Sequence, residues 1–568
     1  MTPHGVRLLL LLLLPLVLAA ASCGGGRDRQ PEPTPAPPEG STPAAEGAEA
    51  AAPPAASQGS ALFAQGVASG DPAPDRVMLW TRIEGREGEV PVAWAVYRDP
   101  SATQRVAGGR ATARPEEDHT VRVDATGLEA GTTYYYRFAV GEERSVIGRT
   151  RTLPTGEVDR VRLAVVSCSN YPAGYFHAYR AIAERADIAA VLHLGDYMYE
   201  YPEEHETEDG ERVGYGDGTP LNREPEPAGE VITLDDYRQR YRSYRSDPDL
   251  QEVHRQHPFI PVWDDHETAN NSWVNGAENH DPQTEGPWRR RRAAALQAYF
   301  EWLPVRRPER SGPRLYRSFA FGELLDLFML DGRLEGRDRQ VDQTDPRWTA
   351  EDRHMLGDTQ EQWLISGLRA SDAAWRLVGQ QTVFSPVIGP EMRRNTDQWD
   401  GYPAARNRIL SAIAGGRGQP PVTDVVILSG DIHSSWAFEV PRDPFANDGS
   451  YDARSGRGSL AVELVTPATS SEPVGVALRN QGMDVEVMLG SAVSTHPHLK
   501  WVNALRNGYL IVDLTAERAI GEWWFIDDVR SPEFGQSFAR AYRVDRGSAH
   551  LVELGEATEP PPAPALAP

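Results

Sequence analysis

Four apolar runs that each end in potential metal ligands constrain the fold of this chain more than any other feature. They are VRLAVVSC (161–168), IAAVLHLGD (188–196), FIPVWDD (259–265) and DVVILSGD (424–431). Stretches with helical character lie between them, including PWRRRRAAALQAYFEWL with its early proline and DTQEQWLISGLRAS with Asp358 as expected N-cap. This alternation predicts an α/β domain, whose sites commonly lie just past the ends of strands.

The region before residue 154 has a different pattern. Residues 60–153 contain short β-type runs, such as RVMLWTRI and TTYYYRFAV, with turn signals between them. This pattern resembles a fibronectin type III sandwich. We therefore expect a small all-β support domain here, with a ligand-binding module as the alternative, followed by the α/β domain over residues 158–552.

Both ends of the chain have the composition of segments outside a folded domain. Residues 1–22 predict a signal peptide for Sec export, and small residues before Cys23 resemble a bacterial lipobox. We expect lipidation at Cys23, with ordinary cleavage as the alternative, and thus a location in the periplasm or on the outer face of a bacterial membrane. The linker 23–58 and the tail 553–568 are rich in Pro and Ala and are predicted to be disordered.

Charge and cysteine content narrow the functional classes. A net charge of −24 argues against specific nucleic-acid binding through a basic surface. The chain has two cysteines, so Cys168 has no disulfide partner if Cys23 carries lipid. Cys168 could then be buried filler, a nucleophile or a metal ligand.

The order of the strand-end motifs resembles the calcineurin-like metallophosphoesterases. The segments are SCSN, GDYMYEY, DDHE and GDIH. Their departures from the general pattern are similar to those of the PhoD-like alkaline phosphatase D family, as are GVASGDPAPDRVMLWTRI, LGDTQEQWL and DQWDGYPAAR. The resemblance covers roughly residues 60–530. It implies two β-sheets flanked by helices, an iron and calcium pair, and phosphoric ester hydrolysis.

Ligand chemistry independently divides the candidate metal-binding residues into two sets. Cys168, Tyr199 and His433 favour a transition metal, and a phenolate points to Fe³⁺. Asp265 and Asp431, with Asp196 bridging, form an all-carboxylate set suited to Ca²⁺, with Mg²⁺ or Mn²⁺ possible. Cys168 is therefore expected to be an iron ligand.

The mechanism expected from such a pair is attack on phosphorus by a hydroxide held between the cations. His266 occupies the family's catalytic-histidine position and could protonate the leaving oxygen. Arg333 is expected to contact phosphate. Weaker substrate-binding candidates are Asn170, Asp397, Trp399, Tyr402 and His498, with His496 beside the last.

Three functions remain open at this point. We expect an exported, monomeric hydrolase of phosphomonoesters, phosphodiesters or both, acting on small or polymeric phosphate esters. The first alternative is a phosphodiesterase specialised for lipid headgroups, teichoic acid or nucleic acid. The second is a non-catalytic surface-binding lipoprotein, which contacts the membrane only through its anchor.

Overall fold

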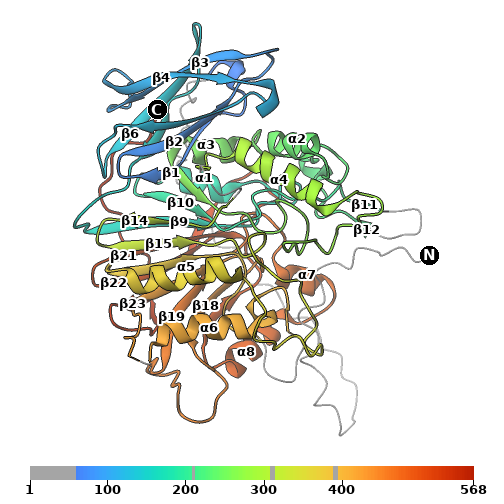
Figure 1. Ribbon diagram of the computed structural model, residues 1–568, viewed down its shortest axis with the longest axis vertical. Coiled ribbons are helices and arrows are strands. Elements are labelled where there is room, and N and C mark those ends of the chain that lie inside the picture. Colours follow the sequence, from blue (N-terminus) through green and yellow to red (C-terminus); the bar gives the residue numbers. More distant parts are fainter. Residues whose placement is uncertain (1–58, 207–211, 308–313, 388–393, 417) are drawn as a thin grey trace, which may run out of the picture.

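A computed structural model of the protein describes residues 59–206, 212–307, 314–387, 394–416 and 418–568. Its main body consists of two stacked β-sheets with helices on their outer faces, and an all-β region adjoins one end (Figure 1). This confirms the expected layered α/β class. The predicted signal peptide, Cys23 and the linker lie outside the described residues. Within the described ranges, no helix combines the length and apolarity required to cross a bilayer.

The larger sheet has ten strands in the order β24-β23-β22-β21-β9-β10-β13-β1-β2-β5. These strands are β1 (Val67–Ala73), β2 (Arg76–Arg82), β5 (Thr120–Thr126), β9 (Arg160–Val166), β10 (Ala190–His193), β13 (Pro258–Pro261), β21 (Gly508–Thr515), β22 (Arg518–Ile526), β23 (Gln536–Asp545) and β24 (Val552–Leu554). In the centre, β9, β10 and β13 are parallel. Parallel strands are covered on both faces, which explains their uninterrupted apolar sequences.

The smaller sheet has seven strands in the order β14-β15-β16-β17-β19-β18-β20. They are β14 (Arg317–Phe321), β15 (Leu325–Met329), β16 (Trp375–Gly379), β17 (Val425–Ser429), β18 (Ser435–Pro441), β19 (Ser459–Val465) and β20 (Leu499–Asn503). Side chains of both sheets, including Leu163, Leu428 and Leu464, share one core. The indole of Trp523 on β22 also donates to the Val465 carbonyl at 2.9 Å, which ties the two sheets together.

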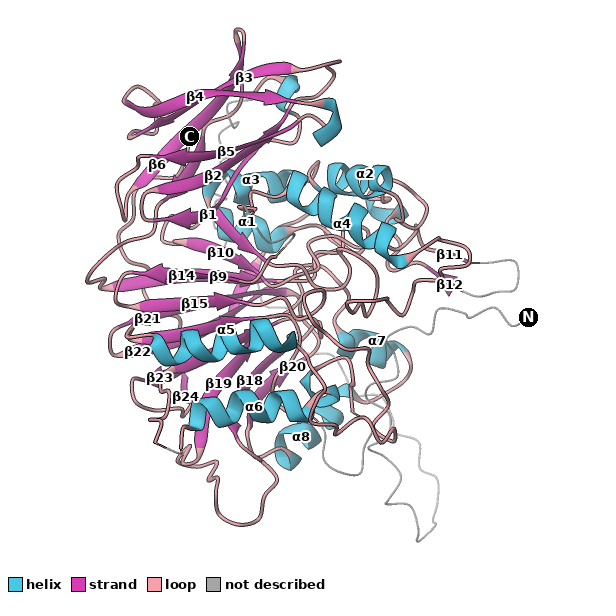
Figure 2. Cartoon of the chain, in the orientation of Figure 1, coloured by secondary structure: helices cyan, strands magenta, loops and turns pink. Residues whose placement is uncertain are grey.

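Helices cover the outer faces of the two sheets (Figure 2). They are α1 (His177–Ala183), α2 (Leu234–Tyr244), α3 (Pro248–Gln256) and α4 (Trp288–Trp302) beside the larger sheet, α5 (Gly357–Ala370) and α6 (Pro403–Ala414) on the smaller one, and α7 (Val474–Asn480) and α8 (Val485–Thr495) near β20. The predicted helices at α4 and α5 are confirmed. Asp358 is not the N-cap of α5: that position is Leu356, and Asp358 lies in the first turn, where a carboxylate still favours the helix dipole.

The N-terminal region is a two-layered β-structure that is not separate from the main body. Strands β3 (Val90–Tyr97), β4 (Arg105–Ala113), β6 (Thr133–Val140), β7 (Glu143–Arg144) and β8 (Gly148–Arg151) pack over β1, β2 and β5. However, β1 pairs in parallel with β13, with Ser69 opposite Pro258. The larger sheet is therefore continuous across the domain boundary expected near residues 153–158.

The C-terminal tail corrects the prediction of disorder. Beyond β24, Thr558 donates to Asp513 at 2.6 Å, and the carbonyls of Ala565 and Pro568 accept from Tyr135 at 2.6 Å and Arg255 at 2.7 Å. Proline removes an N–H but leaves the carbonyl, so a Pro-rich segment can still accept hydrogen bonds. Disorder was predicted from the small apolar surface of this tail, and these hydrogen bonds were not taken into account.

Candidate metal centre

The backbone turns sharply where the central strands end. Cys168, Asp196, Asp431 and His433 have φ angles of 59°, 55°, 68° and 47°, a left-handed conformation that is uncommon for residues with a side chain. Gly195 also has positive φ, at 115°, and a Cβ there would lie 2.5 Å from the Asp264 nitrogen. This glycine lets two loops approach closely, and such strained backbone is frequent at functional sites.

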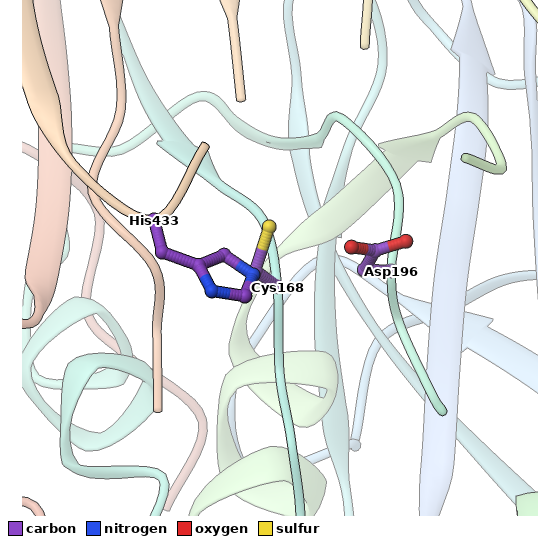
Figure 3. A group of neighbouring side chains, drawn as sticks. All are labelled: Cys168, Asp196 and His433. Atoms are coloured by element: carbon purple, nitrogen blue, oxygen red, sulfur yellow. The ribbon is translucent and has the colours of Figure 1, made fainter. Parts of the chain in front are cut away.

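One group of side chains, here called the cysteine cluster, consists of Cys168, Asp196, Tyr199 and His433. Ligand atoms of Cys168, Asp196 and His433 lie within 4.8 Å of one another, and Figure 3 shows the three side chains converging. The Tyr199 hydroxyl donates to Asp196 Oδ2 at 3.1 Å and lies 3.0 Å from His433 Nε2. The structure thus brings together the three residues predicted on the iron side and Asp196, the predicted bridging residue.

Electrostatics in the cysteine cluster favour a cation. Burial and the neighbouring Asp196 raise the pKa of the Cys168 thiol well above its usual value, and the same causes raise the pKa of Tyr199. Burial lowers the pKa of His433 to about 4, which leaves a neutral imidazole able to bind metal. A bound cation would replace the thiol and phenol protons, so the donors fit a metal.

A second group, here called the aspartate cluster, consists of Asp264, Asp265 and Asp431, whose carboxylate oxygens lie within 4.8 Å of one another. The Oδ1 atom of Asp265 is buried and has no hydrogen-bond partner among the described residues. Arg333 Nη2 forms an ion pair with this oxygen at 3.5 Å but no hydrogen bond, so the oxygen can still accept a hard cation in this all-oxygen set. The predicted residues Asp265 and Asp431 thus lie together with Asp264, whereas the predicted bridging residue Asp196 groups with Asp265 and His266.

Arg333 supplies positive charge to the aspartate cluster. It is fully buried, forms an ion pair with Asp264, and places Nη1 2.7 Å from Asp397 and Nη2 3.3 Å from Asp431. Burial raises the pKa of Asp265, but Arg333 and then His266 outweigh it and lower that pKa to about 2. Burial raises the pKa of Asp264 to about 7. A phosphate contact by Arg333 stays a prediction, because its described contacts are carboxylates.

His266 lies between the two clusters. One of its ring nitrogens, an Asp196 oxygen and an Asp265 oxygen lie within 4.8 Å of one another. Its Nδ1 is 2.8 Å from Glu200 Oε2, and the other Glu200 oxygen accepts from the Asn270 amide at 2.7 Å. Burial disfavours the His266 cation, but Asp265, Glu200 and Asp196 outweigh burial and hold its pKa well above the usual value. The arrangement suits a proton donor.

A cleft of about 880 Å³ lies beside the cysteine cluster, and Asn170 and Tyr215 line it. The Tyr215 hydroxyl is 3.0 Å from His433 Nδ1, and the Asn170 side chain donates to the Tyr215 carbonyl at 2.8 Å. The buried Oδ1 of Asn170 has no partner in the described part of the chain. Asn170 therefore lines the cleft, and its contact with substrate stays a prediction.

The other weak candidates do not lie in this cleft. Trp399 and Tyr402 are at most 2% exposed and belong to the core between the smaller sheet and its helices. Asp397 binds Arg333 and Arg337, and His498 is buried, with Nε2 2.9 Å from the Pro386 carbonyl. The polar groups of Asp397, Trp399 and Tyr402 are engaged within the protein, whereas Nδ1 of His498 is buried without a hydrogen-bond partner among the described residues. Direct substrate contact by these four residues stays a prediction. His496 is likewise buried, beside Phe445.

Several residues of the site were missed from sequence. They are Glu200, Tyr215 and Ser471, whereas Asp264 and Glu267 were recognised as part of the DDHE motif but were given no role. Glu267 accepts from the amides of Asp196 at 3.1 Å and Asp264 at 2.9 Å, which joins two ligand loops. Ser471 donates to the Tyr199 hydroxyl at 2.8 Å. The available sequence signal was membership of a strand-end motif: GDYMYEY contains Glu200, and DDHE contains Asp264 and Glu267. No motif points to Tyr215 or Ser471.

Two packed sheets with paired ligand clusters at their strand ends define the class of metallophosphatases. The fold is similar to that of a purple acid phosphatase from yellow lupin seeds, with a TM-score of 0.51 and 9% identity over 84% of this chain and 74% of that one. At this identity the likeness concerns the fold alone.

The family is shown by closer relatives. The PhoD-like phosphatase family matches residues 163–523, and its N-terminal domain matches residues 48–154. The chain is 34% identical to alkaline phosphatase D of Bacillus subtilis over 525 residues, covering 87% of this chain and 83% of the relative. The structure titled "Structure of PhoD" has a TM-score of 0.75 and 32% identity, covering 89% of this chain and 94% of that one. The chain belongs to the PhoD-like phosphatases and is a phosphoric ester hydrolase.

Proposed function

We propose that this phosphatase hydrolyses phosphomonoesters, phosphodiesters or both, with Fe³⁺ in the cysteine cluster and Ca²⁺ in the aspartate cluster. Mg²⁺ or Mn²⁺ is the alternative at the second site. The observation that supports this assignment is the convergence of a thiol, a phenol and an imidazole on one side of Asp196, with carboxylates on the other. Sulfur and nitrogen donors thus lie on one side only, and the other side offers carboxylate oxygens alone.

The chain's own residues have distinct parts in this proposal. When bound, two such cations supply Lewis-acid activation of water and neutralise charge on phosphoryl oxygens. Glu200 holds Nδ1 of His266, so Nε2 is the nitrogen that can give a proton to the leaving oxygen. Asp196 belongs to the cysteine cluster and also groups with Asp265 and His266, so it links the cysteine cluster to the aspartate cluster.

The cleft beside the cysteine cluster favours esters with a sizeable alcohol group. Its volume of about 880 Å³ exceeds what a phosphate group alone needs. This supports phosphodiesters among the substrates, including those with lipid, teichoic acid or nucleic acid alcohols. A non-catalytic lipoprotein is the less favoured alternative, because ligands for both cations converge.

Metal analysis combined with a substrate panel tests the proposal. Purified protein should contain about one iron and at least one calcium per chain, and should release p-nitrophenol from mono- and bis-p-nitrophenyl phosphate. Asp443→Ala, a change in an exposed loop, is the control for nonspecific damage. Zinc in place of iron, or no turnover of either ester by fully loaded protein, would contradict the assignment.

We also propose export and lipid anchoring at Cys23, on the basis of the leader sequence alone. Mass spectrometry of membrane-extracted protein should find a mature N-terminus at diacylated Cys23. A soluble mature protein that starts elsewhere would contradict the anchor and leave the enzymatic proposal unaffected.

A further inference from the structure

The outer face of the N-terminal sheet carries four arginines. In one row across the strands, Arg110 lies opposite Ala93, Ala93 opposite Ala139, and Ala139 opposite Arg144. In the next row, Gly108 and Arg137 flank Ala95. The intervening residues, such as Val92 and Phe138, point into the core, so these arginines face away from it.

The fourth arginine is Arg105, which lies opposite Tyr97 in a third row. We call Arg105, Arg110, Arg137 and Arg144 together the arginine face. In the part of the chain that the structure describes, none of the four forms an ion pair. Arg105 and Arg144 donate only to backbone carbonyls, at 3.3 Å and 3.1 Å. By contrast, the nearby Arg98 and Arg114 each pair with a glutamate. Uncompensated positive charge is thus concentrated on one face of a protein whose net charge is −24.

The arginine face is hollowed rather than flat. A groove of about 710 Å³ runs over it, and its lining includes all four arginines together with Ala93, Ala95 and Gly109. Small residues form the floor. A Cβ at Gly108 would lie 2.7 Å from Nε of Arg105, so the glycine lets this guanidinium lie along the strand.

We propose that the arginine face is a docking groove for a linear chain of closely spaced phosphates, of the polyphosphate type. Neighbouring strands are about 4.8 Å apart and successive outward residues about 7 Å apart, so the guanidinium groups match a polyanion of high charge density. One arginine guanidinium can donate two parallel hydrogen bonds to two oxygens of the same phosphate. The groove is lined by residues of β3, β4 and β6. Figure 1 shows these strands in the outer layer of the N-terminal region, with β1, β2 and β5 between them and the central strands β9 and β10.

Two other occupants fit less well. A membrane surface would favour apolar side chains at the centre of the patch, and among the described residues the one large hydrophobic exposed on these strands is Val106, at 43%. Single-stranded nucleic acid favours aromatic stacking platforms. Of the aromatic residues that line the groove, Phe138 is buried in the core, Trp94 is half-buried against that core, and Tyr97 is half-buried. The neighbouring Tyr135 is buried with its hydroxyl engaged by the tail.

Binding to long-chain inorganic polyphosphate tests the proposal, and this binding does not depend on the proposed metal chemistry. The full-length protein should bind, and the double variant Arg110→Glu with Arg137→Glu should bind at least about tenfold more weakly and lose part of the salt dependence. A milder pair, Arg110→Gln with Arg137→Gln, should give an intermediate loss. The control Arg518→Glu with Arg546→Glu reverses two exposed arginines far from the groove and should bind like wild type.

Hydrolysis of p-nitrophenyl phosphate should be unchanged in all these variants, which shows that they are folded. Equal polyphosphate affinity in the wild type, the groove variants and the control would overturn the proposal. So would tighter binding to an oligodeoxynucleotide of equal charge, or groove-dependent binding to phosphatidylglycerol vesicles without binding to polyphosphate. If the wild-type protein did not hydrolyse p-nitrophenyl phosphate, that result would instead count against the proposed function.

Discussion

The cysteine cluster and the aspartate cluster differ in how the negative charge of their buried side chains is neutralised. In the cysteine cluster, burial raises the pKa values of Cys168 and Tyr199, so these donors keep protons until a cation replaces them. In the aspartate cluster, the fully buried guanidinium of Arg333 already neutralises part of the charge. The comparison teaches that one side should depend strongly on its metal, whereas the other has a built-in cation.

The largest expected effect follows removal of a carboxylate from the aspartate cluster. Asp265→Ala should lower kcat/KM by at least about a hundredfold, because the unsatisfied oxygen of Asp265 is lost together with the hard cation. Elemental analysis should show calcium lost and iron retained, with Asp443→Ala as the control. Unchanged calcium content would show that the two sets of ligands are divided differently.

Removing the built-in cation should come next. Arg333→Met leaves several buried carboxylates uncompensated and should lower the free energy of unfolding by about 3–5 kcal/mol. Added Ca²⁺ should recover part of this loss, as measured by denaturant unfolding. Arg347→Met, which removes an exposed pair with Asp345, should leave the free energy of unfolding almost unchanged. Equal losses in both variants would contradict the role of Arg333.

Replacing the soft donor tests the other side of the comparison. Cys168→Ser should lower iron occupancy, and Tyr199→Phe should remove the visible phenolate-to-iron band, whereas Tyr509→Phe, a buried tyrosine outside the cluster, should keep it. Because the thiol and phenol pKa values are raised, protons compete better as pH falls. Iron occupancy should therefore fall with decreasing pH. A Cys168→Ser protein with wild-type iron, colour and turnover would make the thiol mere filler.

A smaller effect is expected from the residue that orients His266. Glu200→Gln should lower kcat by about 10–100-fold. Loss of its negative charge lowers the pKa of His266, so the limb of the pH profile that requires protonated His266 should move to lower pH. Asp235→Asn, an exposed carboxylate change on α2, is the control. A lower rate with an unshifted profile would indicate a purely structural role.

The smallest effect tests how far the aspartate cluster extends. Tyr402 packs under Arg337, which holds Asp397, and its hydroxyl donates to the Asp338 carbonyl at 2.7 Å. Tyr402→Phe should cost about 0.5–1.5 kcal/mol of stability and leave KM unchanged. A severalfold rise in KM would instead support a direct contact between Tyr402 and the substrate.

The sequence predicts ligands better than their surroundings. Cys168, Asp196 and Asp431 follow apolar strands directly, and strand ends in one sheet or in two stacked sheets meet at one edge, so convergence follows from pattern. The four-carboxylate environment of Arg333 was not predictable, because it depends on the paths of the loops after β13, β15, β16 and β17. Motif resemblance also failed to separate contact from packing: DQWDGY contains Trp399 and Tyr402, and both are core residues.

The parallel pairing of β1 with β13 has a consequence for how this protein could be divided. A fragment that begins after residue 153 would leave one border of β13 without a partner, along a four-residue strand whose positions are all buried in the intact chain. Unpaired strand borders of this kind recruit other chains. The N-terminal region thus protects the catalytic sheet from self-association, and an excised catalytic fragment should aggregate even if every metal ligand is intact.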